Sequence, residues 1–423
     1  MNHECKGVYK TLEELEKINT LAEYAEMLAP LTKAEISELD KTGFSLATDK
    51  NGQEDRTTFL KNKGISIPNI SGENKFSNPE LLKGNIENFI GMAQIPIGIA
   101  GPLLINGTNA NGEFFVPLAT TEGALVASYN RGMKACRLSG GITSVCLNEG
   151  IQRSPFFKFS NIRVVALFVK WISENKSYFD VITEKTSRFA KLNDLKINIE
   201  GNSVILTFEF STGDASGQNM VTICTDQICK YILANFEITP KEWYIESNYS
   251  GDKKATALSF SNVRGKKVTS EIVIPRNIVA DVLKTTPEKI SKYWQSSTLS
   301  VIQSGSIGAQ GHIANGLTAL FMACGQDVAC ISESSIGLTR METNSNGDLY
   351  VSVTLPSLAV GTIGGGTKLP TQLEALNIMD CAGIGKSKKF AEICGALSLA
   401  GEISIAAAMS VDHFTSAHKN LGR

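Results

Sequence analysis

The chain has 423 residues, of which 42% are apolar and 20% are charged, and its formal net charge is -1. This composition is typical of a globular protein and excludes a disordered or fibrous chain. The balanced charge also excludes a global field that would attract nucleic acid, so an anionic ligand would have to be bound by local groups.

The N-terminal segment lacks the apolar core of a signal peptide, and no part of the chain approaches the roughly 20 uninterrupted apolar residues of a membrane span. Nine cysteines form no C-x-x-C pair and no zinc-ligand spacing, which indicates reduced thiols. We therefore expect a soluble, cytoplasmic protein with no metal site.

The first predicted elements are helices. Residues 12–39 place Leu, Ile and Met at three- and four-residue spacing between charged residues, which predicts amphipathic helices interrupted near Pro30. A polar region over 49–84 leads into IENFIGMAQIPIGIAGPLLI (86–105). The Gly and Pro residues of this segment indicate buried extended structure and the start of a new domain.

Residues 155–248 have a different pattern. RVVALFV (163–169) is typical of a strand, residues 171–192 of a helix, and LKINIE and SVILTFEF of a hairpin around Gly201 and Asn202. A helix over 217–236 and a short strand at EWYIES complete a βαββαβ order, which predicts an inserted ferredoxin-like domain. The rest of the chain is predicted to be mostly helical with Gly-rich joints, with a strand near LYVSVTLPSLAV.

Residues 119–137 predict a helix that opens at Thr120 or Thr121, with Glu122 in its first turn, where helix capping alone would explain a carboxylate. Further along this helix three basic residues recur at every third position. They line one face, which would suit a phosphate-bearing ligand, although a solvated face is the commoner explanation of such spacing. These residues are Arg131, Lys134 and Arg137.

Asp327 follows the apolar run GLTALFMAC, so we expect it to be buried and to have a cationic partner, with a structural Asp as an equal alternative. The polar turn at 252–254 and the tail residue His418 are each of a kind that is most often incidental. Gly364 to Gly366 mark a tight turn or a close approach. No G-x-G-x-x-G after a strand and no P-loop is present, so such motifs do not indicate a nicotinamide cofactor.

Six segments together resemble, in order and spacing, the signature segments of the hydroxymethylglutaryl-coenzyme A reductase family, and of its eukaryotic and archaeal class in particular. They are ENFIGMAQIPIGIAGP, ATTEGALVASYNRG, GDASGQNM, GDKK, GQD and GTIGGGT, and the resemblance covers residues 86–423. It implies an α+β fold with a small N-terminal helical domain (1–85), a large, mainly helical domain for substrate and coenzyme A (86–154 and 249–423), and a small ferredoxin-like NADP-binding domain (155–248).

The resemblance also implies roles for individual residues. It places the catalytic groups at Glu122, Lys253, Asp327 and His418. It places substrate contacts at Arg153, Asp252, Lys254 and Asn315, and coenzyme A contacts at Ser128, Asn130, Arg131, Lys134 and His312. His418 lies in the C-terminal tail, which we expect to close over bound coenzyme A.

The cofactor implied by the resemblance is NADPH, bound without a Rossmann domain. Its contacts fall at Ser187, Arg188, Phe189, Asp214, Ser216, Gly217, Gln218, Asn219 and Gly365. A guanidinium pairs bidentately with phosphate, so Arg188 suits the 2'-phosphate of NADPH. Ser216 and Gln218 stand where the family usually has methionines, and Glu246 replaces a usual small polar residue near the substrate.

The activity implied is the four-electron reduction of (S)-3-hydroxy-3-methylglutaryl-CoA to (R)-mevalonate and coenzyme A, in the mevalonate pathway of isoprenoid biosynthesis. The alternatives are NAD-dependent catabolic oxidation of mevalonate and a non-catalytic homologue that binds coenzyme A. The resemblance further implies a homodimer or homotetramer with active sites shared between subunits.

Overall fold

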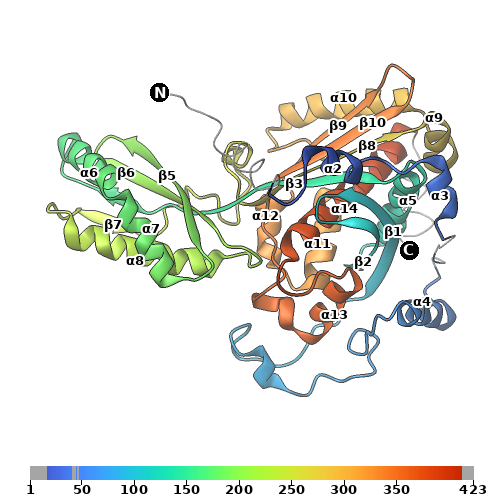
Figure 1. Ribbon diagram of the computed structural model, residues 1–423, viewed down its shortest axis with the longest axis horizontal. Coiled ribbons are helices and arrows are strands. Elements are labelled where there is room, and N and C mark those ends of the chain that lie inside the picture. Colours follow the sequence, from blue (N-terminus) through green and yellow to red (C-terminus); the bar gives the residue numbers. More distant parts are fainter. Residues whose placement is uncertain (1–16, 41–43, 45–46, 412–423) are drawn as a thin grey trace.

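The computed structural model of the protein describes residues 17–40, 44 and 47–411. The chain forms a small part, residues 155–248, that projects from a larger part (Figure 1). Their apolar cores are separate: one is built from the small part together with Ile151, from the strand that leads into it, and the other from the large part. The fold therefore mixes helices and sheets as the α+β prediction requires.

Two short helices stand near the N-terminus, α2 (Leu21–Met27) and α3 (Lys33–Glu38). Each begins at a threonine that forms a capping box with a glutamate three residues later, which satisfies free N–H groups at the helix start. The predicted interruption near Pro30 is confirmed. A third helix, α4 (Lys50–Asn62), forms within the polar region, and its Leu60 packs against Phe115 of the large part.

The apolar segment 86–105 is only partly buried. Strand β1 (Ile97–Gly107) pairs antiparallel with β2 (Asn111–Ala119), and both carry core residues. Residues 86–96 form no strand, and the Ile90 side chain is fully exposed. The prediction of buried extended structure was therefore wrong for the first half of the segment, because those apolar side chains find no cover within one chain.

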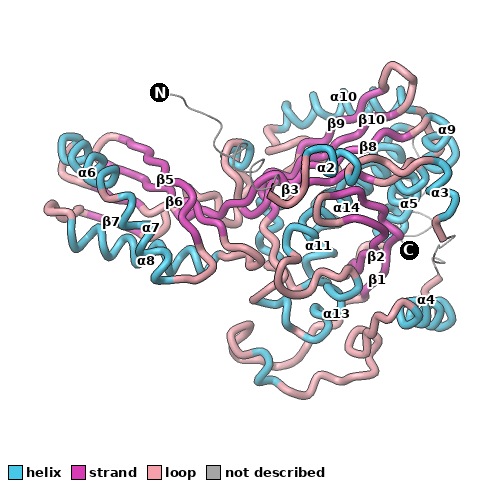
Figure 2. Tube along the Cα trace, in the orientation of Figure 1, coloured by secondary structure: helices cyan, strands magenta, loops and turns pink. Residues whose placement is uncertain are grey.

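The large part contains more sheet than the prediction of a mainly helical domain allowed. Strands β3 (Ile142–Arg153), β8 (Gly265–Ile274), β10 (Leu349–Leu358) and β9 (Leu338–Thr343) are neighbours in that order, and β1 pairs parallel with β3. Helices pack on this sheet and on one another (Figure 2). They are α5 (Leu125–Leu138), α10 (Pro287–Ser304), α11 (Ile313–Cys324), α13 (Pro370–Ile378) and α14 (Ser387–Ser410).

Helix α14 is the centre of the large part. By length and composition it could cross a membrane, yet 83% of its most apolar stretch is buried inside the protein, as in the core helix of a globular fold. Its two glutamates, Glu392 and Glu402, are also buried, and both accept hydrogen bonds from backbone N–H groups. Buried carboxylates of this kind join loops to the core.

The small part contains β4 (Phe156–Lys158), α6 (Ile162–Glu174), α7 (Lys176–Thr186), β5 (Lys191–Glu200), β6 (Ser203–Ser211), α8 (Gln218–Asn235) and β7 (Glu242–Tyr244). The strand order is β7-β4-β6-β5, with every neighbouring pair antiparallel. The predicted hairpin and the helix over 217–236 are confirmed.

The prediction of a strand at RVVALFV was wrong, because these residues lie in helix α6. Asn161 caps the helix by accepting from the N–H groups of Arg163 and Val164. Val165, Phe168 and Ile172 are buried at helical spacing, so the apolar run reflects a helix face rather than a strand. The first strand of the small part is instead the three-residue β4.

Strand β3 connects the two parts. Residues 143–150 pair with β8 in the large part, and residues 151–153 pair with β6 in the small part. The strand thus runs without a break from one sheet into the other (Figure 1). Arg153, its last residue, lies at the junction of the two parts.

Candidate active site

A tight turn at residues 251–254 presents Lys253. The Lys254 N–H donates to the Gly251 carbonyl at 3.1 Å and closes the turn, and Lys253 has a φ of 54° in the left-handed region. A residue with a Cβ rarely adopts this conformation, so the surrounding contacts must hold it. The turn at 252–254 is therefore more than the plain surface that its sequence suggests.

Lys253 forms an ion pair with Asp327, with 2.9 Å between Nζ and Oδ2. The hydrogen bond to Asp327 raises the pKa of the lysine, which favours the ammonium form. The prediction of a cationic partner for Asp327 is confirmed, but the prediction of burial was wrong, because 43% of its side chain is exposed. Asp327 lies beyond the end of α11 and caps η4 (Val328–Cys330).

Asp252 holds the same turn in place through ion pairs with two arginines. Its carboxylate accepts from Arg153 at 2.7 Å and also from Arg264, and both guanidiniums are almost fully buried. Burial alone would raise the pKa of Asp252, but the two arginines lower it below its ordinary value. Glu246 adds a second carboxylate, 3.6 Å from Arg153. Arg153 is therefore engaged by protein carboxylates in the free chain.

Two residues of this network were not singled out from the sequence, Arg264 and Glu333. Glu333 lies on α12 (Ile331–Ser334), is fully buried, and accepts from Arg264 Nε at 3.3 Å and from the Lys253 N–H at 3.2 Å. Burial raises the pKa of Glu333. Neither residue belongs to a recognisable motif; the signal that could have found them is the need of a buried charge for a partner.

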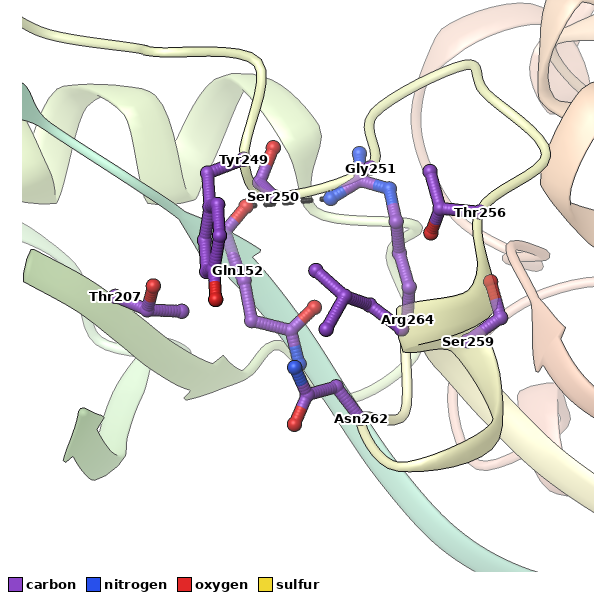
Figure 3. Close-up of a pocket in the computed structure, with 10 residues that line it drawn as sticks. Gln152, Thr207, Tyr249, Ser250, Gly251, Thr256, Ser259, Asn262 and Arg264 are labelled. Atoms are coloured by element: carbon purple, nitrogen blue, oxygen red, sulfur yellow. Dashed lines mark hydrogen bonds between the residues drawn. The ribbon is translucent and has the colours of Figure 1, made fainter. Parts of the chain in front are cut away.

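A small cavity of about 10 Å³ lies beside the turn, at the junction of the two parts (Figure 3). Its walls include Gln152 from the end of β3 and Tyr249, Ser250 and Gly251 from the segment before Lys253. Arg264 contributes its guanidinium, which donates to the Gln152 carbonyl at 3.2 Å. The polar groups that line the cavity therefore come from the segment of the lysine turn and from Arg264, which binds Asp252 of that turn.

Glu122 lies elsewhere on the chain. It precedes α5, whose first cap residue, Ala124, is left-handed and offers no side-chain cap, so the prediction that Glu122 lies in the first turn of the helix was wrong. The carboxylate instead accepts from Asn315 Nδ2 at 2.8 Å, on the first turn of α11. Asn315 and the Lys253–Asp327 pair stand toward opposite ends of α11, and the nine residues that follow Asn315, up to Cys324 at the end of the helix, rise by roughly 14 Å.

His312 supports this second site. Its ring stacks on Tyr129 with 4.9 Å between centroids, and burial lowers its pKa, so the neutral ring is favoured. The His312 Nε2 atom is buried and has no hydrogen-bond partner among the described residues. Glu402 of α14 accepts from the His312 N–H, and Tyr129 donates to the His312 carbonyl at 2.7 Å.

The three basic residues on one face of α5 differ in their surroundings. Arg131 donates to the carbonyl of Ser404 at 2.6 Å, and Arg137 is paired with Glu113, so both are engaged within the protein. Lys134 is exposed. Two further predicted contacts, Ser128 and Asn130, also bond internally, to Ser404 and to the Gly101 N–H.

The predicted cofactor turn links α7 to β5. Ser187 accepts from the N–H groups of Phe189 and Ala190, which fixes the turn. Phe189 is 65% exposed and the Arg188 guanidinium lies over its ring at 5.9 Å. An exposed guanidinium beside an exposed aromatic ring could receive both the phosphate and the base of a nucleotide.

The second predicted cofactor segment, residues 213–219, lies between the two parts. Asp214 accepts from the N–H groups of Gly385 and Ser387 at the start of α14, and these bonds outweigh its burial and lower its pKa. Gly217 is left-handed and precedes α8, and Gln218 Nε2 lies 2.7 Å from Cys330 Sγ. Ser216 is half-buried and Asn219 is exposed.

The Gly-rich segment at 364–366 packs against the loop that carries Asp327. A Cβ added to Gly325 would meet the Gly366 carbonyl oxygen, and one added to Gly366 would meet Gly325. Gly365, the first residue of η5 (Gly365–Lys368), faces open space. The close approach therefore belongs to Gly366, whereas Gly365 remains free to meet a ligand.

His418 lies outside the described residues, so the structure does not place it. Lys254 is exposed and donates from Nζ to the Asp252 carbonyl at 2.9 Å. Of the predicted catalytic residues, the structure therefore brings Lys253 and Asp327 together. It places Glu122 with Asn315 in a second group.

The sequence is similar to those of known proteins. The family model for hydroxymethylglutaryl-coenzyme A reductase matches residues 52–423. The 3-hydroxy-3-methylglutaryl-coenzyme A reductase of Pyrococcus abyssi is 45% identical over 388 residues, covering 88% of this chain and 94% of the relative. That of Methanocaldococcus jannaschii is 40% identical over 410 residues, covering 95% and 99%.

Solved structures give the same fold. The class II 3-hydroxy-3-methylglutaryl-CoA reductase from Streptococcus pneumoniae, bound to NADPH in open conformations, aligns with a TM-score of 0.67 at 18% identity. The alignment covers 90% of this chain and all of that one. At this identity the likeness concerns the fold alone.

Proposed function

We propose, since the chain belongs to the hydroxymethylglutaryl-coenzyme A reductase family, that it reduces (S)-3-hydroxy-3-methylglutaryl-CoA to (R)-mevalonate and coenzyme A with NADPH. The observation that carries the proposal is the ion pair between Asp327 and Lys253, on a turn in which the lysine is held in the left-handed conformation. This activity belongs to the mevalonate pathway of isoprenoid biosynthesis.

In the first reduction, Lys253 stabilises the oxygen of the substrate. When the thioester carbonyl is reduced to a hemithioacetal, negative charge develops on that oxygen, and a fixed ammonium lowers the energy of this state. The raised pKa of Lys253 keeps the group charged near neutral pH. Asp327 orients the ammonium and does not itself contact the developing charge.

Coenzyme A leaves when the hemithioacetal collapses: the carbon–sulfur bond breaks, and the thiolate takes a proton. We assign that proton to His418 as general acid, carried by a tail that closes over coenzyme A. In the second reduction, of mevaldehyde, we assign the proton on the new alcohol oxygen to Glu122. The exposed carboxylate of Glu122, held by Asn315, is accessible to a substrate.

NADPH would supply the two hydrides when bound. We propose that the small part holds it, through the turn at 187–189, the segment 214–219 and Gly365. The exposed Arg188 fits the 2'-phosphate, and the open space at Gly365 fits a close approach of backbone to ligand. The internal bonds of Asp214 favour a supporting role, in which it holds the segment at α14.

We propose domains at 1–85, 86–154 with 249–423, and 155–248, the last with a ferredoxin-like arrangement. The separate apolar cores and the strand order β7-β4-β6-β5 support this division. We further propose that the protein is soluble and cytoplasmic.

We propose that coenzyme A contacts Ser128, Asn130, Arg131, Lys134 and His312. The substrate, through its carboxylate or its thioester, would contact Arg153, Asp252, Lys254 and Asn315.

We also propose a homodimer or homotetramer in which subunits share active sites. Two observations support this: Glu122 is distant from Lys253 along α11, and the apolar residues Ile86, Ile90 and Met92 are exposed. A second chain that covered residues 86–96 would remove these side chains from water. It could also bring its own Glu122 to Lys253.

The test is the stoichiometry of NADPH oxidised to coenzyme A thiol released, repeated with NADH. Two NADPH per thiol, with NADH poor, would support the biosynthetic reduction. A preference for NAD in the reverse direction would instead indicate catabolic oxidation of mevalonate. Tight binding of coenzyme A with no oxidation of either cofactor, and no turnover that depends on Lys253, would indicate a non-catalytic homologue.

A further inference from the structure

Glu333 is a buried carboxylate that takes no part in the proposed steps of the reaction. It lies six residues after Asp327, on α12, which follows η4 directly, and none of its side chain is exposed. A buried carboxylate is costly unless it is paired, and a core position could hold an apolar residue instead. Its contacts therefore indicate why a charge is present.

Those contacts lead to the lysine turn. Oε1 accepts from the Lys253 backbone N–H at 3.2 Å and from Arg264 Nε at 3.3 Å. Oε2 is buried and has no partner among the described residues, so both bonds fall on one oxygen. Arg264 in turn binds Asp252, the residue before Lys253. Glu333 thus contacts the turn directly and through Arg264.

The bond to the Lys253 N–H is made at the strained position of the turn. Lys253 is left-handed, and the turn's own hydrogen bond, from Lys254 to Gly251, leaves the Lys253 N–H free. Glu333 is the acceptor that the structure gives for this N–H, and the bond is part-buried. The left-handed conformation directs the Lys253 side chain, so its acceptor also fixes where the ammonium lies.

The loop that carries Asp327 and the lysine turn are therefore joined at two points. One is the ion pair between Lys253 and Asp327, which is partly exposed and weak by itself. The other is the part-buried bond from the Lys253 N–H to Glu333. We propose that Glu333 is a positioning residue, which holds the Lys253 backbone so that its ammonium meets Asp327 and the substrate oxygen.

This inference rests on the proposed function, and variants at position 333 test it. Glu333→Met keeps the buried volume but removes the acceptor, whereas Glu333→Gln keeps an acceptor oxygen and removes the charge. We expect Glu333→Met to lower kcat by roughly tenfold to a hundredfold, because small displacements of a catalytic group cost rates of this order. We expect Glu333→Gln to retain kcat within about threefold, since its amide oxygen can replace Oε1.

The matched control is Glu392→Gln, another buried carboxylate on the large part, which binds the turn after β1 instead of the lysine turn. It should lose thermal stability without a selective loss of kcat. KM for NADPH should stay within about twofold in both variants at position 333, because a displaced ammonium affects reduction rather than cofactor binding. If Glu333→Met does not fold, Glu333→Asp, one methylene too short to reach both partners, takes its place.

Hydrogen exchange gives a readout that does not depend on activity. The Lys253 amide should exchange faster in Glu333→Met than in the parent, and at the parent rate in Glu392→Gln. Equal kcat in Glu333→Met and Glu333→Gln, together with unchanged exchange at Lys253, would overturn the inference. A parent enzyme without reductase activity would overturn the proposed function instead, and faster exchange in Glu333→Met would still support the contact.

Discussion

The Lys253 ammonium lies 2.9 Å from the Asp327 carboxylate, although the two residues are separated by more than seventy positions in the chain. The hydrogen bond to Asp327 makes the largest contribution to the raised pKa of Lys253. Each side chain is partly exposed, so the pair controls the charge and direction of the lysine more than it stabilises the fold.

Asp327→Asn should move the alkaline limb of the kcat–pH profile to lower pH. The folded-state pKa of Lys253 is raised, so its ammonium, and the part of stability linked to it, persists until the pH rises through that pKa. Removal of the carboxylate lowers the pKa, and the ammonium is lost earlier. Rate–pH profiles of the two proteins check this; Asp348→Asn, at the distant hairpin between β9 and β10, should leave the limb unchanged.

Glu122→Gln and Lys253→Ala should each be nearly inactive, and a mixture of the two should regain activity. If one active site combines Glu122 of one subunit with Lys253 of another, a mixed dimer has one intact site of two. Random exchange between equal amounts should therefore restore about a quarter of the parent activity. The measurement uses co-refolded variants, and a mixture as inactive as its components would contradict sharing.

Gly325→Ala should lower both stability and kcat. Gly325 has a φ of 67°, and its added Cβ would meet the Gly366 carbonyl oxygen, so the loop to Asp327 must shift. We expect a loss of about 2–4 kcal/mol in the free energy of unfolding, from strain at positive φ together with the collision. Gly364→Ala is the control, because it has a φ of 82° and open space. Denaturant unfolding should find it the milder change.

Arg188→Ala should weaken the preference for NADPH. Loss of hydrogen bonds from a guanidinium to phosphate costs roughly 1.5–3 kcal/mol, which corresponds to a rise in KM for NADPH of about tenfold to a hundredfold. KM for NADH, which has no 2'-phosphate, should change little. Arg163→Ala on α6 of the same small part serves as control. An equal rise in KM for both cofactors would show that Arg188 binds something other than the 2'-phosphate.

Local sequence patterns predicted much of the fold. The helices on either side of Pro30, the hairpin at Gly201 and the apolar helices were recognisable because their causes lie within a few residues. The strand at RVVALFV was wrong because a short apolar run satisfies either period, and the cap at Asn161 decided it. Glu122 was misplaced because the left-handed Ala124 delays the helix, and nothing in the sequence marks that conformation.

The site was predicted less completely than the fold. Lys253 and Asp327 were identified through family resemblance, and the structure joins them. Arg264 and Glu333 were missed because buried ion pairs join residues distant in sequence, and neither residue has a local pattern. The exposure of Asp327 was also unexpected, since an apolar helix before a residue does not determine how the chain turns after it.

Strand β3 has a mechanical consequence. The small part is joined to the large part at two places, because β3 belongs to both sheets and Asp214 accepts from the N–H groups of Gly385 and Ser387 at the start of α14. Arg153 lies at the first of these junctions and binds Asp252 of the lysine turn, whereas the turn around Arg188, at the end of α7, belongs to the small part alone. The two junctions therefore fix the proposed nucleotide contacts of the small part relative to Arg153 and the lysine turn.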